Sequence, residues 1–456
     1  MTATASKTVV VLGAAYGGVH CAKMLAASLP ADWRVVAIDR NSHMNHVYVF
    51  PRCIVKSTLA PKAFVPYKYM FVPPKEEEKK EDGTTAVPLT PPQTPPPETA
   101  PAPSRHRLVQ GLITRLERNR VTVVKPNAAG TYDDADAAEP PADRTETIDF
   151  EYAVYALGAT LPAPVDVWGG GGPVAGRGTK KGGVTWMQDT GGVFGAAKRV
   201  LIVGGGALGI QYATDLKDTY PDKEVTLLHS RKRLLPIYPE EVHGIVVSRL
   251  DTLGVRTVLG ERVLEWPENP GVLDGVEKVV RTDKGTEYAA DVVLVCTGPK
   301  PHTAVMRAFD ERTISPVTGR IRVLPTTQVS LAPVAPFEPA AADADAADAL
   351  AALSLDAPTN IFSIGDCAQT AAIQAGHTSY WQGEVAARNI VRLVKGEGEA
   401  LEEYAPGVPA IKVTLGINHW VIANRDGVTT GDDGVEHLLA RNMWQVYGAG
   451  DDPDDA

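Results

Sequence analysis

Residues 198–235 read KRVLIVGGGALGIQYATDLKDTYPDKEVTLLHSRKRLL, and this stretch decides the fold. Its apolar, β-branched run 200–203 predicts a strand, and residues 204–209 then satisfy the spacing G-x-G-x-x-G. A helical pattern follows over 210–218, and a second apolar run over 225–228 closes a strand–helix–strand unit. A glycine-rich turn between such a strand and helix is typical of sites that bind a dinucleotide.

Each glycine of this fingerprint has a mechanical task. Gly204 permits the tight turn after the strand, Gly206 lets the backbone approach a pyrophosphate, and Gly209 lets the helix pack closely on the strand. The helix that follows presents free N–H groups and a positive dipole end to the phosphates. The unit therefore predicts a dinucleotide-binding domain.

A second, degenerate fingerprint lies near the N-terminus. The apolar run 8–12 predicts a strand, and it is followed by Gly13, Ala15 and Gly18, with alanine in place of the middle glycine. Asp39 ends the next predicted strand, where a carboxylate would accept hydrogen bonds from a ribose. Two fingerprints in one chain suggest two dinucleotides bound side by side.

The bulk composition excludes several classes of protein. A length of 456 residues, 44% hydrophobic and 22% charged, describes a soluble globular chain of two or three domains. The formal net charge of −10, without a basic block, argues against a nucleic-acid partner. The start lacks the pattern of a signal peptide, and no apolar stretch reaches the length of a membrane span. We therefore expect a cytoplasmic protein that is not secreted.

Disulfide and metal chemistry find little support in the sequence. The two histidines His43 and His46 have no cysteine or carboxylate beside them, so no metal site is predicted. The cysteines lie far apart, form no C-x-x-C pair and fit a reducing compartment. They are Cys21, Cys53, Cys296 and Cys367.

Two segments interrupt the globular pattern. Residues 73–104 combine a run of glutamate, lysine and aspartate with a proline-rich stretch, which predicts a disordered surface insertion. After it, strands are predicted over 108–113 and 121–124. Residues 333–358 are mostly alanine and aspartate and form a second predicted insertion.

Three strand–turn motifs complete the pattern. The stretch FEYAVYALGAT is a buried strand that runs into a turn of small residues at Gly158, and DVVLVCTGPKP repeats this form at Gly298. In NIFSIGDCAQ a strand ends at Gly365 and Asp366, and a helix rich in small residues begins shortly afterwards.

In this order the pieces resemble the flavoproteins with two dinucleotide-binding domains. Within them the chain is most similar to the apoptosis-inducing-factor-like branch, which includes the ferroptosis-suppressor type NAD(P)H:quinone oxidoreductases and their fungal relatives. The resemblance is carried by EVTLLHSRKRLLP (224–236), TDKGTEYAADVVLVCTG (282–298) and IFSIGDCAQ (361–369). It implies an α/β fold of two Rossmann-like domains, the glutathione-reductase-like FAD/NAD(P) fold, with a small C-terminal α+β segment.

The same resemblance divides the chain. Residues 1–165 and 301–400 are expected to form the two parts of an FAD-binding domain, residues 166–300 an NAD(P)H-binding domain, and residues 401–456 the C-terminal segment.

The resemblance also assigns FAD to the first fingerprint and NADPH or NADH to the second. Asp366 would bind the ribityl or pyrophosphate portion of FAD, and the helix starting near Gly376 would aim its N–H groups at the flavin pyrimidine edge. Arg52 follows the loop that leaves the first strand–helix–strand unit. The residues expected to hold the cofactors are Gly13, Ala15, Gly18, Asp39, Arg52, Gly158, Gly204, Gly206, Gly209, His229, Arg231, Gly298, Gly365, Asp366 and Gly376.

Three departures from the family pattern bear on function. The usual A-T-G turn reads Ala-Leu-Gly at Gly158, so its threonine contact is lost. Gln211 stands where related enzymes usually carry a glutamate close to the nicotinamide, and an amide cannot act as a base. The usual acid after the second strand is replaced by His229, with Arg231 two residues on. An acid would repel a 2′-phosphate and an arginine could pair with one, which favours NADPH.

His377 and Trp381 are expected to flank the flavin ring and the acceptor pocket, because residues four apart share a helix face. Core packing explains Trp381 equally well. Together with Gln211 they are the expected catalytic residues. The missing cysteine pair argues against a disulfide relay, so a quinone or another small electron acceptor is the expected partner.

Other interpretations stay open at this stage. A ferredoxin or rubredoxin reductase would need a basic docking patch, and a flavin monooxygenase would need a stable hydroperoxide. A redox-sensing or death-signalling protein would turn over slowly. Residues 435–447 could form a short helix, whose apolar residues allow peripheral contact with a membrane or mitochondrial surface, but core packing explains them as well. The sequence leaves the oligomeric state open.

Overall fold

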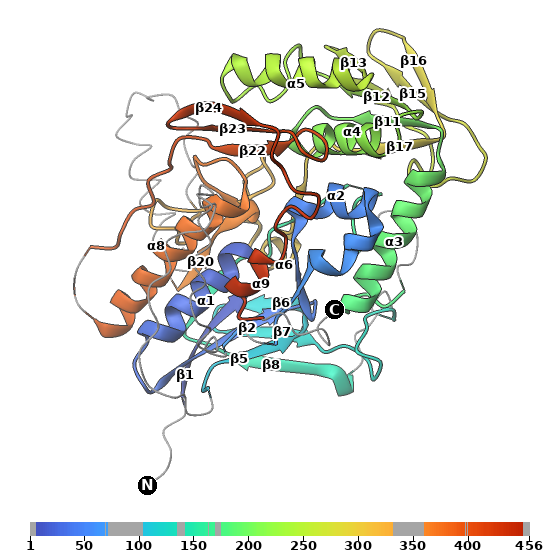
Figure 1. Cartoon of the computed structure of the whole chain (residues 1–456). Helices are drawn as coiled ribbons and strands as arrows, with labels where there is room; N and C mark the ends of the chain where they lie inside the picture. Colours follow the sequence, from blue (N-terminus) through green and yellow to red (C-terminus); the bar gives the residue numbers. More distant parts are fainter. Residues whose placement is uncertain are drawn as a thin grey trace.

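The structure is a computed structural model that describes residues 6–68, 70–71, 104–134, 142–162, 164–168, 175–331, 360–396, 398 and 400–449. The predicted insertion 333–358 lies outside the described residues, as does 73–104 apart from Ser104. The described chain forms two larger parallel sheets with helices, three three-stranded antiparallel sheets and three two-stranded sheets around them (Figure 1).

The N-terminal domain is built on a five-stranded parallel sheet. Its strands, in spatial order, are β20 (Ile361–Ser363), β9 (Tyr152–Tyr155), β1 (Lys7–Leu12), β2 (Trp33–Asp39) and β5 (Arg107–Gln110). The β-branched run of β1 is buried on both faces, as is usual for a central parallel strand. Two helices, α1 (Tyr16–Ser28) and α8 (Gly376–Lys395), pack against each other on this sheet although they lie far apart in sequence.

The second domain repeats the design with four parallel strands. They are β13 (Arg256–Leu259), β12 (Glu224–His229), β11 (Arg199–Val203) and β17 (Val292–Val295). The helix α4 (Ala207–Thr219) connects β11 to β12, and α5 (Glu240–Leu253) connects β12 to β13. The strand–helix–strand unit predicted over 198–235 is therefore confirmed.

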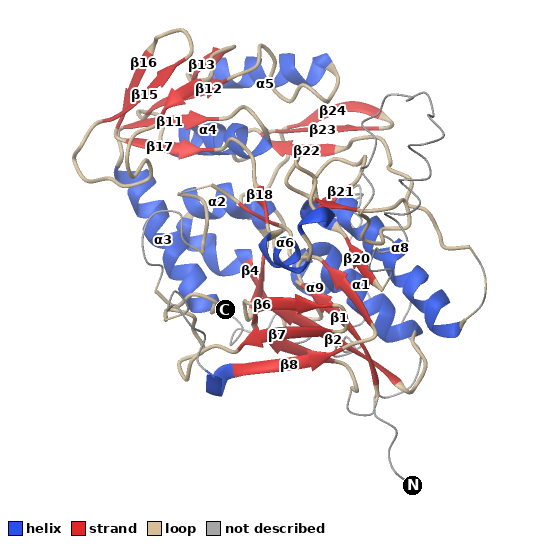
Figure 2. Cartoon of the chain, turned by 180° about the vertical axis from the view of Figure 1, so that it is seen from behind, coloured by secondary structure: helices blue, strands red, loops and turns tan. Residues whose placement is uncertain are grey.

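Smaller antiparallel sheets lie beside each domain, as Figure 2 shows from behind. The first domain carries β6 (Leu112–Glu117), β7 (Arg120–Val124) and β8 (Thr145–Asp149), and the second carries β14 (Val263–Glu265), β15 (Lys278–Thr282) and β16 (Glu287–Ala290). The chain passes between the domains through β10 (Ala159–Thr160) and β18 (Lys300–Pro301), which pair antiparallel.

Shorter elements and one longer helix complete the described chain. The helix α3 (Lys180–Ala196) precedes β11 and runs along the side of both domains in Figure 1. The rest are β3 (His43–Asn45), η1 (Val47–Val49), α2 (Phe50–Val55), η2 (Ser57–Ala63), β4 (Phe64–Pro66), η3 (Ala142–Arg144), α6 (Ala304–Phe309), η4 (Glu311–Thr313), β19 (Ile321–Arg322), η5 (Gly365–Cys367) and β21 (Ala368–Gln369).

The C-terminal segment is the expected small α+β unit. Its strands β22 (Ile411–Thr414), β23 (Trp420–Asn424) and β24 (Gly427–Gly431) form an antiparallel sheet beside α4 and α5 (Figure 1). One expectation is corrected here, because no helix spans 435–447. Leu438 and Leu439 have positive φ angles of 53° and 51°, which break a helix, and only α9 (Asn442–Val446) forms.

The largest hydrophobic core joins all three units. Phe50 and Ile54 of α2, Ile210 and Leu216 of α4, and Val421 of β23 are buried in one cluster. A core that is continuous across domains holds them in a fixed relation rather than as independently moving bodies. None of the helices in the described part of the chain is long and apolar enough to cross a membrane.

Candidate functional site

The first fingerprint forms a cradle in which side chains do not fit. Gly13 has a φ of +96°, and a Cβ added there would lie 2.4 Å from the carbonyl oxygen of Ala156. A Cβ on Gly18 would lie 2.0 Å from the carbonyl oxygen of Gly13. Ala15 is the N-cap of α1 and its side chain makes no capping hydrogen bond, so the helix presents N–H groups that a pyrophosphate can accept.

Asp39 lies at the end of β2 next to this cradle. One carboxylate oxygen accepts the Ala14 N–H at 2.9 Å and the Tyr67 hydroxyl at 3.2 Å, and the other accepts the Asn41 N–H at 2.9 Å. Burial raises the pKa of Asp39, and the N–H groups of Ala14 and Asn41 oppose that shift. A carboxylate has about four lone-pair sites. Three are used, so one is left for a ribose hydroxyl.

Gly365 and Asp366 follow β20, where the sequence placed them. Gly365 has a φ of +74°, and its N–H donates to the Gln382 side chain at 2.7 Å. The Asp366 carboxylate accepts no hydrogen bond from the residues that the structure describes, although Arg320 donates to the Asp366 backbone oxygen at 3.0 Å. Burial raises the pKa of Asp366, and the charge of Arg320 opposes that shift. The carboxylate therefore has room for a polar ligand.

The second fingerprint repeats the cradle of the first. Gly204 has a φ of +126°, and a Cβ on it would lie 2.2 Å from the carbonyl oxygen of Cys296. A Cβ on Gly209 would lie 1.9 Å from the carbonyl oxygen of Gly204. Gly206 is the N-cap of α4, makes no side-chain cap and faces open space. This helix end, too, can receive a pyrophosphate.

His229 ends β12 and contacts the second fingerprint. Its Nδ1 accepts the Gly205 N–H at 3.0 Å, so the proton of the neutral imidazole lies on Nε2. That Nε2 is buried and has no hydrogen-bond partner among the described residues. Burial lowers the pKa of His229, the charge of Arg231 lowers it further and the backbone of Arg233 opposes the shift, so the ring is neutral at pH 7. An unpaired buried donor beside the fingerprint fits an oxygen-rich ligand.

The two small-residue turns follow β9 and β17, one strand from each parallel sheet. Gly158 has a φ of +66° and accepts the His302 N–H on its carbonyl at 2.9 Å. Gly298 has a φ of +110°, and neither glycine has any atom within 4 Å of an added Cβ. These turns are open and flank the crossing between the domains made by β10 and β18.

A profile of the pyridine nucleotide-disulphide oxidoreductase family matches residues 7–333. The chain belongs to this family. Family membership makes the protein a flavoprotein oxidoreductase with FAD and a pyridine nucleotide as cofactors. The side-chain-free cradles, the two helix ends, the Asp366 carboxylate and the His229 Nε2 fit these groups.

Two curated relatives match nearly the whole length of this chain. Fe-regulated protein 8 of Mycosarcoma maydis is 34% identical over 452 residues, which covers 98% of this chain and 96% of the relative. Ferroptosis suppressor protein 1 of Homo sapiens is 25% identical over 423 residues, covering 91% and 87%. These relatives confirm the branch of the family that the sequence resembles.

Solved structures share the fold at low identity. NDH2 from Plasmodium falciparum, in complex with NADH, matches with a TM-score of 0.63 and 10% identity over 97% of this chain and 94% of that chain. A NAD-dependent persulfide reductase from A. fulgidus matches with a TM-score of 0.58 and 18% identity, covering 91% of this chain but 63% of that chain. Both confirm two Rossmann-like domains.

Arg52 is a correction to the sequence analysis. Its side chain is fully buried and pairs with Asp215 of α4 at 2.8 Å. The same guanidinium donates to the carbonyls of Gly416 at 2.7 Å and Glu436 at 3.0 Å. These contacts occupy both terminal nitrogens, so Arg52 joins α2, α4 and the C-terminal segment instead of contacting a cofactor.

Gln211 also makes a contact that the sequence did not predict. Its side-chain amide donates to the Thr414 hydroxyl of β22 at 3.0 Å. The amide N–H thus ties the first turns of α4 to the C-terminal sheet, and its carbonyl oxygen stays available. The structure places Gln211 at this junction, and its catalytic role stays a prediction.

His377 and Trp381 share one face of the first turns of α8. Trp381 is 46% exposed, so core packing does not explain it. Burial lowers the pKa of His377, which is therefore neutral at pH 7. The Gly376 N–H, expected to point at the flavin, instead donates to the Tyr48 hydroxyl at 2.5 Å. At the observed helix end, the Tyr48 hydroxyl thus takes the N–H that was expected to face the flavin.

All four cysteines are buried and free. Burial raises the pKa of Cys53 and Cys296 to about 12 and that of Cys367 to about 11, and it raises the pKa of Cys21 further. Buried thiols with raised pKa values are poor nucleophiles. Their environment disfavours a thiol–disulfide relay, as the spacing predicted.

Sequence reasoning missed two tyrosines that contact the first cradle. Tyr67 donates to Asp39, and Tyr447 donates to the Ala14 carbonyl at 3.3 Å. Both are almost fully buried, and their rings lie 5.7 Å apart. Tyr447 comes from the far end of the chain, and no local pattern could have indicated it.

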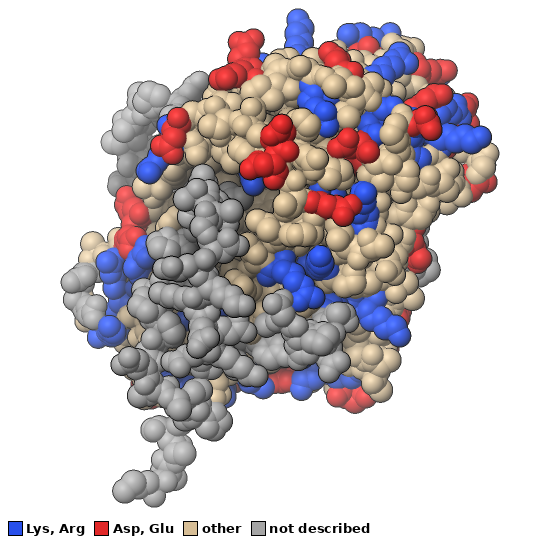
Figure 3. Space-filling view, in the orientation of Figure 1, with Lys and Arg blue, Asp and Glu red and all other residues tan. Residues whose placement is uncertain are grey.

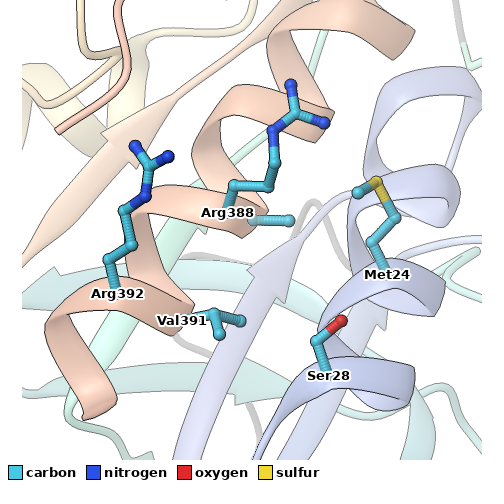
Figure 4. A pocket seen from close by; sticks show the side chains of 6 residues that line it. Met24, Ser28, Arg388, Val391 and Arg392 are labelled. Atoms are coloured by element: carbon cyan, nitrogen blue, oxygen red, sulfur yellow. The ribbon is translucent and has the colours of Figure 1, made fainter. Parts of the chain in front are cut away.

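A small cavity of about 180 Å³ lies between α1 and α8, where Figure 4 shows Met24, Ser28, Arg388, Val391 and Arg392 around it. Ligand pockets usually measure about 300–1,000 Å³. Arg388 is held by Glu384 at 3.1 Å and by Glu402 at 2.8 Å. This cavity is too small for a dinucleotide and belongs to the packing of the two helices.

The charges on one face of the protein are mixed. Figure 3 shows Lys and Arg side chains interspersed with Asp and Glu over the upper part of this face, with a small basic group near its centre. A mixed surface of this kind does not form the extended basic patch that docking of an acidic electron carrier would need.

Proposed function

We propose that this flavoprotein transfers reducing equivalents from NAD(P)H to a quinone. The observation that carries the proposal is the helix end of α8, where the Tyr48 hydroxyl meets the backbone at Gly376 and His377 within reach of the Asp366 charge, one turn before the exposed Trp381. This group is polar at one end and apolar at the other, as a quinone is. The resemblance to the ferroptosis-suppressor type quinone oxidoreductases supports the same acceptor.

Bound FAD would supply the redox chemistry, taking a hydride from the nicotinamide and passing two electrons to the acceptor. The chain's own residues would position the nicotinamide, the flavin and the acceptor relative to one another. The cradles of Gly13 and Gly204 would hold the two pyrophosphates on separate domains. The continuous core fixes the relative position of the two domains, so that the nicotinamide and the flavin could meet at the domain boundary.

The proposed nucleotide is NADPH in preference to NADH. The His229 Nε2 proton is a buried donor without a partner in the described chain, and it would meet a 2′-phosphate or ribose oxygen. Arg231 is exposed and close enough to lower the pKa of His229, so it adds positive charge at the same place. A carboxylate here would repel a phosphate, and a neutral imidazole with an arginine attracts one.

The proposal is tested with the variant His377→Ala. The purified protein is assayed for NAD(P)H oxidation by a short-chain ubiquinone, and its FAD content is measured separately. We expect quinone turnover to fall about tenfold, the cost of one good hydrogen bond or contact in the transition state, with FAD content unchanged.

The matched control is His419→Ala, which removes an exposed histidine from the turn between β22 and β23. It should leave turnover unchanged. Equal turnover in the His377→Ala variant and the wild-type protein would show that His377 takes no part in reducing the acceptor. A wild-type protein that reduces no quinone would contradict the function itself.

A further inference from the structure

Tyr48 is the middle residue of η1 and caps the N-terminus of α8 from another part of the chain. Its phenol oxygen accepts the Gly376 N–H at 2.5 Å. An added Cβ on Gly376 would lie 2.8 Å from this oxygen, so the hydroxyl sits directly against the helix end. Yet Tyr48 remains 45% exposed, which is unusual for a large aromatic side chain with a specific polar contact.

Two rings hold Tyr48 in this place. The Tyr16 ring lies 5.2 Å from the Tyr48 ring and the His46 ring lies 6.2 Å from it. Tyr16 and His46 are themselves joined by a 2.9 Å hydrogen bond between the phenol oxygen and Nδ1. Both are buried, so they form a rigid wall behind Tyr48. The phenol is therefore positioned in advance of any ligand.

The Tyr48 hydroxyl donates no hydrogen bond within the described part of the chain. A phenol donates one hydrogen bond and accepts others. Tyr48 accepts from the helix end, and its own O–H proton has no acceptor among the residues that the structure describes. The positive end of α8 draws electron density from the oxygen, which makes the O–H a stronger donor.

The phenol stays protonated at neutral pH. Although the Tyr48 side chain is partly exposed, the protein packed around its hydroxyl desolvates it and raises its pKa to about 12; the N–H of Gly376 opposes that shift, and the charge of Asp366 adds to it. A group in this state donates a hydrogen bond without giving up its proton.

We infer that the Tyr48 hydroxyl donates a hydrogen bond to a carbonyl oxygen of the electron acceptor. This inference rests on the proposed quinone reductase function and adds a reason for its acceptor class. A carbonyl oxygen gains negative charge as it is reduced, and a fixed donor aimed at that oxygen stabilises the change. An acceptor without a carbonyl gains nothing from Tyr48. Tyr48 thus acts as a specificity residue for carbonyl-bearing acceptors.

The test compares two acceptors in the variant Tyr48→Phe. A short-chain ubiquinone has carbonyl oxygens, whereas ferricyanide takes electrons through a metal complex. We expect kcat/KM for the quinone to fall about tenfold and the rate with ferricyanide to stay at the wild-type value. The affinity of the oxidised, NAD(P)H-free holoprotein for the same ubiquinone, measured by the perturbation of flavin absorbance, should also weaken about tenfold.

Tyr380→Phe is the matched control, because Tyr380 belongs to the same aromatic group but points its hydroxyl at the Met443 sulfur, 3.8 Å away. It should leave both acceptors and the quinone affinity unchanged. Wild-type quinone turnover in Tyr48→Phe would overturn the inference alone. An equal fall with both acceptors, with weaker retention of FAD, would also overturn it and assign the hydroxyl to the cofactor. A wild-type protein that reduces ferricyanide but no quinone would overturn the proposed function together with the inference.

Discussion

Arg52 and Asp215 form a buried ion pair, and the substitution Arg52→Met should strongly lower the free energy of unfolding. Both side chains have no exposed surface, and the pair is 2.8 Å long. Removing one member of a buried pair leaves the other charge uncompensated and costs about 3–5 kcal/mol. Methionine matches the length of the arginine stem, so little of this loss comes from packing.

The destabilisation should depend on pH. Burial raises the pKa of Asp215, and Arg52 opposes that shift. Without Arg52 the folded state binds a proton on Asp215 more tightly than the unfolded state does. Stability then falls as pH rises and recovers as pH falls through the raised pKa. The wild-type protein should show a weaker dependence over the same range.

The assay is urea unfolding of wild-type and variant protein at several pH values, followed by fluorescence and circular dichroism. The double variant Arg52→Met/Asp215→Leu should lose much less stability than Arg52→Met alone, because no charge is stranded. Arg107→Met is the surface control. It breaks a pair with Glu146 in which Arg107 is 45% exposed and should cost less than about 1 kcal/mol. If Arg52→Met also cost less than that, the pair would not join the three units as described.

The remaining predictions concern the two cofactor sites. Gly18→Ala places a Cβ 2.0 Å from the Gly13 carbonyl oxygen, so α1 must shift and the protein should lose FAD on gel filtration. Gly192→Ala, in an open position on α3, should retain FAD and raise stability by about 1 kcal/mol. Arg231→Ala should raise KM for NADPH about tenfold, the value of one charge-assisted hydrogen bond, and leave KM for NADH unchanged in steady-state assays. His229→Asp should reverse the preference towards NADH, and a variant that still prefers NADPH would contradict the assignment.

Much of the fold could be predicted because its signals are local. The run before Gly204 has the period and composition of a buried parallel strand, and the glycine spacing that follows has a steric reason that the structure bears out. The same holds for Gly13 and Gly18. The predicted strand over 108–113 shows the limit of this reasoning. It splits into β5 and β6 at Gly111, because the chain there moves from the parallel to the antiparallel sheet.

The contacts that the sequence did not predict are all long-range. Arg52 contacts Asp215 and Glu436, residues 163 and 384 positions away, and local pattern carries no information on such pairs. Tyr48 reaches Gly376, 328 positions away, in the same manner. A tyrosine in an apolar run reads as core packing, and only the folded chain brings its hydroxyl to a helix end. The helix over 435–447 is interrupted by the positive φ angles of Leu438 and Leu439, so that only α9 forms, with Trp444 buried.

We propose that this NAD(P)H-dependent flavoprotein reduces a quinone. The most direct test is anaerobic double-mixing stopped flow on the purified protein, following flavin absorbance. The first mix is with NADPH or NADH, and the second is with a short-chain ubiquinone. We expect fast bleaching, faster with NADPH, and then fast recovery of the absorbance on addition of quinone. Bleaching that no quinone reverses would contradict the proposed acceptor, and a protein that neither retains nor takes up flavin would contradict the whole account.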